Sequence, residues 1–144
     1  MEFGYKKLYI GGALVDSVSK TRSDVICPAD GKTIAQIAEA GKADAEKALE
    51  AAQKGFEFWS KCSLSERTQW MLKLREAVLE NEHLLRSAIV YEMGKTYDAA
   101  YEDIEAVVNA LDWYPNAMKN LRDEQIPDYE NTHTHKMIQQ PAGV

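Results

Sequence analysis

The stretch Trp59–Lys95 reads WSKCSLSERTQWMLKLREAVLENEHLLRSAIVYEMGK, and it predicts how the middle of the chain folds. Ser63 and Glu66 have the spacing of a capping box, in which two side chains satisfy free amide groups at a helix start. Apolar residues then recur every three or four positions, which is typical of helices with one buried face. Asn81 can cap a second helix, and Gly94 supplies its left-handed stop. The stretch therefore predicts two consecutive helices.

Helices are also predicted on both sides of this stretch. Residues 45–59 carry apolar side chains at helical spacing, and Thr96 can open a fourth helix. Pro115 is expected to kink or end that last helix, with a break near Tyr114 favoured, because proline lacks an N–H and its ring clashes one turn back. The apolar residues expected to face inward from the four helices are Ala45, Ala48, Leu49, Ala52, Phe56, Trp59, Trp70, Met71, Leu74, Val78, Leu84, Leu85, Ala88, Ile89, Ile104, Val107, Val108 and Leu111.

The two ends of the chain predict short strands. Gly11-Gly12 and Asp30-Gly31 each lie between apolar runs and favour tight hairpin turns. Residues 120–131 are polar, contain Pro127 and predict a loop. Thr132–Gln140 is rich in residues that strands tolerate, and we expect it to form an edge strand. No repeat or linker divides the 144 residues, so the pattern predicts one α/β domain with N-terminal hairpins, about four helices and a C-terminal edge strand.

Composition and charge limit the classes of function. An apolar fraction of 45% is typical of folded proteins, and a net charge of −6 argues against nucleic acid or anionic membrane as a partner. No apolar run approaches the ~20 residues that span a bilayer, and the first residues lack the apolar segment of a secretory signal. The two cysteines have no metal-binding or disulfide spacing. A reducing cytoplasm is therefore the expected compartment.

Short motifs along the chain resemble, in order, those of the aldehyde dehydrogenase family. Glu92-Met93-Gly94-Lys95 is similar to the family's E-[ML]-G-K, and Ser65-Glu66-Arg67 fits the start of its second helix. Each motif alone is weak, but their order over almost the whole chain makes the resemblance specific. The other segments that carry it are Leu8-Tyr9-Ile10-Gly11-Gly12, Pro28-Ala29-Asp30-Gly31-Lys32, Gly55-Phe56-Glu57-Phe58-Trp59 and Pro141-Ala142-Gly143-Val144.

Four positions depart from the family pattern. Cys27 stands where Asn is usual, Asp30 where Ser or Thr is more common, and Thr96 where Pro is frequent. Pro115 stands where a small, helix-compatible residue is usual. None of these changes removes chemistry, and only Pro115 bears on local helix geometry.

The resemblance implies an α/β aldehyde dehydrogenase fold, represented by part of one domain. Residues 1–144 would be the N-terminal part of the coenzyme-binding domain, and residues 132–144 the start of the oligomerisation strand. The family oxidises aldehydes to acids with NAD or NADP, using a cysteine nucleophile, an oxyanion-binding asparagine and a glutamate that activates water. The motifs P-W-N, K-P-[SA]-E and G-Q-x-C that carry these functions are absent from the sequence. We therefore expect no catalytic residue, no cofactor-binding residue and no bound NAD or NADP in this chain alone.

Cysteine and histidine side chains are candidates for a nucleophile or for metal ligands. Cys62 follows Lys61, which can lower a thiol pKa, but no histidine motif adjoins it, so a structural role is favoured. Cys27 is expected to be a buried hairpin residue. His133 and His135 would face the same side of a strand and could share a metal, but an exposed edge strand near an oligomer interface is the favoured interpretation.

Charged residues on the helices carry two further alternatives. Glu92 and Lys95 invite an acid–base or phosphate-binding role, but the motif is better explained as a helix end. Some members of the family bind a structural cation with an acidic residue and a backbone carbonyl, and by that resemblance Glu105 and Ile26 are the metal candidates. A solvated helix face is the favoured alternative for Glu105.

Two functions from different classes follow. The first is the N-terminal part of an NAD(P)-dependent aldehyde dehydrogenase, acting on an aldehyde as a homo-oligomer and inactive as this chain alone, whether as a truncated product or a fragment. The second is a non-enzymatic or vestigial module that pairs with a full-length relative through Thr132–Gln140, because an edge strand has unpaired backbone groups.

Overall fold

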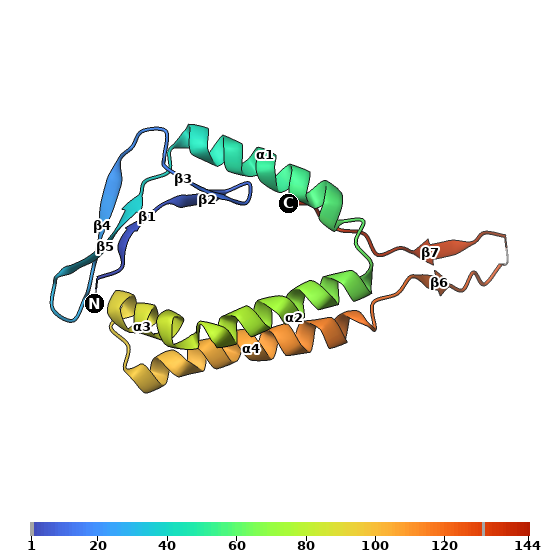
Figure 1. The fold of residues 1–144 in the computed structure, drawn as a ribbon. Helices are drawn as coiled ribbons and strands as arrows, with labels where there is room; N and C mark the ends of the chain where they lie inside the picture. Colours follow the sequence, from blue (N-terminus) through green and yellow to red (C-terminus); the bar gives the residue numbers. More distant parts are fainter. Residues whose placement is uncertain (1, 131) are drawn as a thin grey trace.

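The computed structural model describes residues 2–130 and 132–144, which form an open frame of two small β-sheets, four helices and a projecting hairpin (Figure 1). The first strands and the first helix line one part of the frame, and the other three helices line the part opposite. The elements in chain order are β1 (Gly4–Lys6), β2 (Leu8–Ile10), β3 (Ala13–Val15), β4 (Arg22–Ile26), β5 (Thr33–Ala38), α1 (Lys42–Trp59), α2 (Leu64–Glu80), α3 (Glu82–Met93), α4 (Tyr97–Met118), β6 (Glu124–Ile126) and β7 (His135–Met137).

Both predicted N-terminal hairpins are confirmed. Strands β2 and β3 pair antiparallel around Gly11 and Gly12, whose φ angles of 60° and 83° only glycine adopts readily. Strands β4 and β5 pair antiparallel around the Asp30-Gly31 turn. The pattern did not predict β1, which lies parallel to β5 with Gly4 opposite Ala35. A three-residue strand has too little periodicity to be recognised without its partner.

The helix starts depend on side chains that satisfy free amides. At α2, Ser63 Oγ accepts from Glu66 N at 3.2 Å and Glu66 Oε2 accepts from Ser63 N at 2.7 Å, which confirms the capping box. At α4, Thr96 Oγ1 accepts from Ala99 N, as predicted. Asn81 differs from expectation, since its Nδ2 donates to the Ala77 carbonyl of α2 and does not cap α3.

Helix α1 begins with an acid that the sequence did not single out. Asp44 is only 2% exposed, and its carboxylate accepts from Gly41 N at 3.0 Å and from Val18 N at 3.1 Å. The first contact caps the helix, and the second fastens the loop after β3 to it. Asp44 thus joins the strands to the first helix.

The predicted break at Pro115 is wrong, because α4 continues to Met118. Pro115 lies in the last turn of the helix, where its missing N–H removes a single backbone bond. Its ring is buried, and Asn116 Nδ2 donates to the Asp112 carbonyl at 2.9 Å. Burial and this local bond offset the cost that proline carries in a helix interior.

The predicted loop over residues 120–131 is also wrong in part, because β6 lies within it. β6 pairs antiparallel with β7, so only His135–Met137 of the predicted Thr132–Gln140 segment is a strand. All six residues of these two strands are exposed. The sequence did not predict β6, because a two-stranded ribbon that is exposed to solvent on both faces has no alternation of apolar and polar residues.

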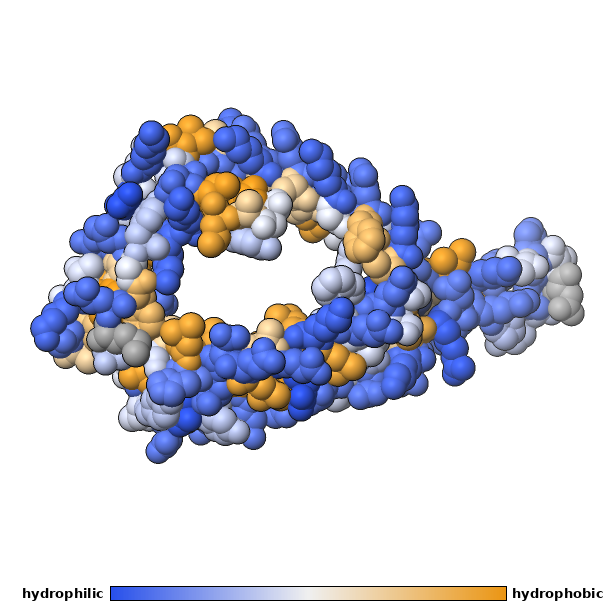
Figure 2. Space-filling view, in the orientation of Figure 1, coloured by the Kyte–Doolittle hydropathy of each residue, from blue (hydrophilic) through white to orange (hydrophobic). Residues whose placement is uncertain are grey.

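Half of the side chains expected to form the helix core are exposed, and only Ile104 and Leu111 are buried. The chain exposes 10947 Å², whereas a compact monomer of 16.2 kDa exposes roughly 7,500 Å². Trp70 and Leu49, expected to face inward, are 51% and 62% exposed, because no element among the described residues packs over them. Figure 2 shows apolar residues gathered along the inner rim of the frame.

Buried apolar positions are few and lie at the junctions between elements. Helix α4 follows the prediction most closely, with Ile104 and Leu111 buried where it packs against α2 and α3. The buried apolar residues are Cys27, Ile34, Ala35, Ala38, Cys62, Ala100, Ile104 and Leu111. None of the described helices is long and apolar enough to span a membrane.

Candidate functional site

The EMGK motif of residues 92–95 lies at the turn between α3 and α4, where it meets the second hairpin. Gly94 has a φ of 71°, and a Cβ atom added to it would lie 3.0 Å from Pro28 Cγ. Glycine is required here twice, by the left-handed backbone and by the approach of the proline ring. Two motifs that are distant in the sequence thus form one structural contact, which confirms the interpretation of Gly94 as a helix stop.

Lys95 is held by a neighbouring acid on α4. Its Nζ donates to both carboxylate oxygens of Asp103, at 2.6 and 2.9 Å. The charge of Lys95 is therefore paired within the chain. This ion pair links the end of α3 to α4. Glu92 is exposed at the end of α3. The acid–base role that the motif invites has no supporting geometry.

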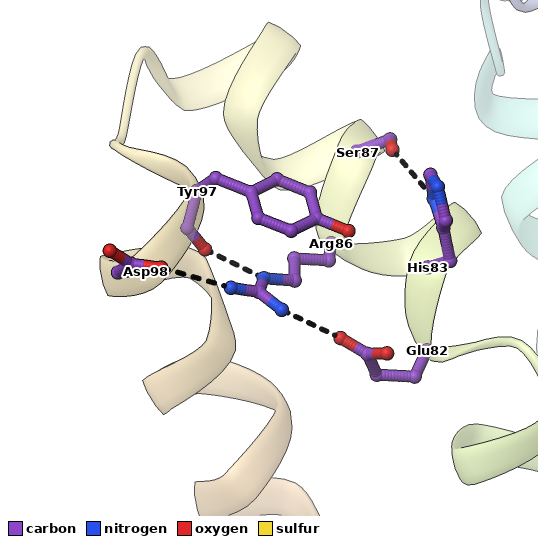
Figure 3. Close-up of polar contacts among 6 residues, drawn as sticks. All are labelled: Glu82, His83, Arg86, Ser87, Tyr97 and Asp98. Atoms are coloured by element: carbon purple, nitrogen blue, oxygen red, sulfur yellow. Dashed lines mark hydrogen bonds and ion pairs between the residues drawn. The ribbon is translucent and has the colours of Figure 1, made fainter.

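Arg86 is the centre of the polar network at the same turn (Figure 3). Its Nε donates to the Tyr97 carbonyl at 2.6 Å, and its two terminal nitrogens contact Glu82 at 3.2 Å and Asp98 at 3.4 Å. The guanidinium carbon lies 3.6 Å from the centroid of the Tyr97 ring and 5.1 Å from that of Tyr101. Arg86 therefore ties the start of α4 to α3 by hydrogen bonds and by cation–π contact.

Sequence reasoning did not identify Arg86. Its side chain is only 15% exposed, which is unusual for arginine outside a paired site. The sequence did contain a signal for an ion pair, because Glu82 and Arg86 are spaced four residues apart on a predicted helix. His83 is exposed and lies edge-on to the Tyr97 ring, with Nδ1 3.3 Å from Ser87 Oγ.

Both cysteines are buried free thiols. Cys27 lies in the turn after β4, where its amide bonds the Lys32 carbonyl, as expected of a hairpin residue. Cys62 lies between α1 and α2, and its Sγ is 3.6 Å from the Phe58 carbonyl. No histidine contacts either thiol among the described residues, so neither has the geometry of an activated nucleophile.

The metal candidates remain predictions. His133 and His135 have ring centroids 6.2 Å apart, which places them on one side of the hairpin as expected. Glu105 is exposed on α4, and Ile26 is exposed at the end of β4. Within the described residues, no group of three or more His, Cys, Asp or Glu side chains could hold a metal ion.

The starts of α1, α2 and α4 do not fit the pyrophosphate of a dinucleotide. Such a group binds free amides at a helix N-terminus. Here the α1 start is closed by Asp44, the α2 start by Ser63 and Glu66, and the α4 start by Thr96. The chain's own oxygen atoms thus already accept hydrogen bonds at these three starts. Two of the acceptors, Asp44 and Glu66, are carboxylates and would repel phosphate.

A pocket of about 730 Å³ between the β2–β3 turn and α1 does not supply the missing features. Lys47 and Lys54 could attract phosphate, but Glu50 lies in the same wall and no helix start opens into it. The absence of a dinucleotide site in this chain therefore stays a prediction.

The family model described as "Aldehyde dehydrogenase family" matches residues 14–144. Among curated proteins, malonate-semialdehyde dehydrogenase 2 of Bacillus cereus is 32% identical over 138 residues, which cover 96% of this chain and 28% of that protein. The corresponding protein of Bacillus mycoides is 30% identical over 138 residues. The chain thus spans about 28% of the length of the Bacillus cereus relative.

Solved structures agree with these sequence relatives. Betaine aldehyde dehydrogenase from Staphylococcus aureus, in complex with NAD+, aligns with a TM-score of 0.87 and 25% identity over 94% of this chain and 27% of that one. A 3,6-anhydro-L-galactose dehydrogenase shares the fold, with a TM-score of 0.83 at 21% identity over 90% of this chain and 27% of its own length. The ordered motifs, the fold and the family match over residues 14–144 lead to one conclusion: the chain belongs to the aldehyde dehydrogenase family.

Proposed function

We propose that residues 1–144 are the N-terminal part of the coenzyme-binding domain of an NAD(P)-dependent aldehyde dehydrogenase, which oxidises an aldehyde to a carboxylic acid. The observation that carries this proposal is the uncovered apolar surface of the frame. The chain exposes roughly 3,500 Å² more than a compact monomer of its mass, and apolar patches lie along the inner rim (Figure 2). A surface of this size and polarity fits burial against further parts of a larger enzyme.

In this proposal the chain supplies a scaffold and contributes no reacting group. The starts of α1 and α2 are closed to phosphate by their own carboxylates, and the buried thiols have no histidine beside them among the described residues. The nucleophile, the activating glutamate and the nicotinamide contacts would lie on the remaining part of the enzyme. The cytoplasm is the proposed compartment, because both cysteines are free.

The proposal is tested with a chimera and with the chain alone. Residues 1–144 replace the matching segment of the Bacillus cereus malonate-semialdehyde dehydrogenase, and NADH formation from malonate semialdehyde is measured. We expect a soluble, active chimera, because the scaffold restores the domain, and no NADH or NADPH formation by residues 1–144 with an aldehyde panel. A folded but inactive chimera, or activity of the isolated chain, contradicts the proposal.

A second candidate function is supported by the exposed β6–β7 hairpin. We infer that Thr132–Gln140 pairs with another chain, because both strands expose every residue and the hairpin projects away from the frame (Figure 1). In the full enzyme this would be the start of an oligomerisation strand, and in the chain alone it would pair with a full-length relative.

Strand pairing predicts a defined response to proline. Lys136→Pro should abolish co-purification with a full-length relative, since proline removes a backbone donor from β7. The matched control is Tyr129→Pro, because Tyr129 lies outside both strands and is 98% exposed. Equal co-purification of the wild type and Lys136→Pro chains would exclude this mode of pairing.

A further inference from the structure

A pocket of about 350 Å³ lies where α1 and α2 meet, beside the end of α4 and the C-terminal segment. This corner is the one from which the β6–β7 hairpin projects (Figure 1). The residues that line the pocket are Ser60, Leu64, Arg67, Met118, Leu121, Gln139, Gln140 and Pro141.

Arg67 is the single charged residue in this lining. Its Nε has almost no exposed surface and no hydrogen-bond partner in the part of the chain that the structure describes. An enclosed guanidinium N–H without an acceptor is unfavourable, because it has lost water and gained nothing in exchange. The pocket is therefore lined by a guanidinium whose enclosed Nε has no acceptor and which forms no ion pair among the described residues.

Other partly buried arginines of the chain are paired. Arg75 Nε lies 2.9 Å from the carboxylate of Asp112, and Arg86 contacts Glu82 and the Tyr97 carbonyl. No Asp or Glu lines the Arg67 pocket, although the chain carries a net charge of −6. The pocket is thus a cationic position without a counter-charge on a protein that has an excess of acids.

We propose that this pocket binds the carboxylate group of a small organic acid, with Arg67 as the charged donor. A guanidinium presents parallel N–H groups that match the two oxygens of a carboxylate. The amides of Gln139 and Gln140 provide additional donors in the same lining, and Leu64, Met118 and Leu121 provide apolar contact for a short carbon chain. One cation beside three apolar side chains suits a monocarboxylate better than inorganic phosphate. The proposal does not rest on the dehydrogenase function.

The test follows the Nε–Hε resonance of Arg67 by NMR in the 144-residue chain. Titration with butyrate should move this resonance in a saturable way, with a Kd of roughly 1 mM, as expected for one charged contact and a short apolar chain. Butanamide, which has the same shape without the charge, should bind at least tenfold more weakly because the charge-assisted bond is lost. Equal responses to the two compounds would overturn the proposal, and so would saturation by phosphate but not by butyrate.

Variants separate this pocket from general charge effects. Butyrate binding, followed on the Gln139 and Gln140 side-chain amides, should weaken at least tenfold in Arg67→Gln and stay unchanged in Arg122→Gln, which removes an exposed arginine outside the lining. Gln140→Glu places a carboxylate in the pocket wall and should abolish the response of Arg67. Unweakened binding in Arg67→Gln or Gln140→Glu overturns the proposal, as does an Arg67 shift that depends on protein concentration and not on butyrate.

Discussion

Two corners of the frame hold an enclosed arginine, and they differ in how its charge is satisfied. At the corner between α3 and α4, Arg86 contacts a backbone carbonyl, two carboxylates and the faces of two tyrosines. At the corner between α1 and α2, Nε of Arg67 has no partner among the described residues. The same type of side chain therefore acts as a clamp in one corner and has an unpaired, enclosed Nε in the other.

The difference shows which corner is complete within the chain. The α3–α4 corner also contains the Gly94–Pro28 contact and the Lys95–Asp103 pair, so its polar groups and its backbone are determined by neighbours. The α1–α2 corner has a satisfied capping box but an unsatisfied side chain. Substitutions should therefore lower the free energy of unfolding more at the α3–α4 corner than at the α1–α2 corner.

The largest effect is expected from Arg86→Met. The change removes three polar contacts and leaves the Tyr97 carbonyl and Glu82 without their donor, so the free energy of unfolding should fall by about 2–3 kcal/mol. Urea unfolding measures this change. Asp98→Asn, whose side chain is fully exposed, is the control and should cost under about 0.5 kcal/mol. Equal losses would mean that the exposed pair, and not the carbonyl contact, holds the corner.

The next largest effect is expected from Gly94→Ala. The new Cβ would meet Pro28 Cγ at 3.0 Å and would strain a residue at φ 71°, so stability should fall by about 1–2 kcal/mol. Repeating the change in a Pro28→Ala background separates the two causes. Relief of the whole loss in that background would show that the contact, and not the backbone angle, requires glycine.

Ser63→Ala should have a smaller effect, at the other corner. Loss of the hydroxyl that accepts from Glu66 N should cost about 1 kcal/mol in thermal or urea unfolding. Hydrogen bonds from the Ser63 side chain, and then from its backbone N–H, hold the pKa of Glu66 below its usual value of 4.5.

The lowered pKa of Glu66 sets the pH dependence of this cap. A carboxyl whose pKa is lower in the folded state stabilises the fold above its unfolded pKa, and the contribution disappears as the pH falls through the folded value. Wild type and Glu66→Gln should therefore differ most at neutral pH and converge as the pH falls through the lowered pKa of folded Glu66. A difference that grows on acidification would contradict this assignment.

The smallest effect is expected from Arg67→Met. Replacing an enclosed donor that lacks a partner with an apolar side chain of similar length should change stability by less than about 0.5 kcal/mol, or raise it slightly. Arg86→Met is the matched substitution at the paired corner. A loss at Arg67 as large as that at Arg86 would show that Arg67 has a partner in solution.

The sequence allowed the caps, turns and order of elements to be predicted, because each depends on a few adjacent residues. Ser63 with Glu66, Gly94, and the pair Gly11-Gly12 each specify a local conformation that the structure contains. Burial was predicted poorly, because an apolar stripe indicates which helix face can pack against another element and not whether such an element is present. Trp70 and Leu49 carry the periodicity of core residues and are exposed.

The candidate site was harder to predict than the elements. Arg86 and Tyr97 lie on different helices, and their contact depends on the angle at the α3–α4 turn, which no local pattern encodes. The pocket beside Arg67 includes Gln139, Gln140 and Pro141 of the C-terminal segment, which is distant in the sequence. The Pro115 break failed for a related reason, since burial of the ring and the Asn116 bond come from the surroundings of the residue.

The open frame has a calorimetric consequence. Unfolding can expose to water only the apolar area that the fold removes from it, and the heat capacity change of unfolding scales with that area. Globular domains gain about 12–15 cal/mol/K per residue on unfolding. With 10947 Å² already exposed, this chain should fall below that range and show a flat dependence of stability on temperature. Burial of the inner rim by a partner would restore the ordinary curvature, so the heat capacity change reports whether the frame is filled.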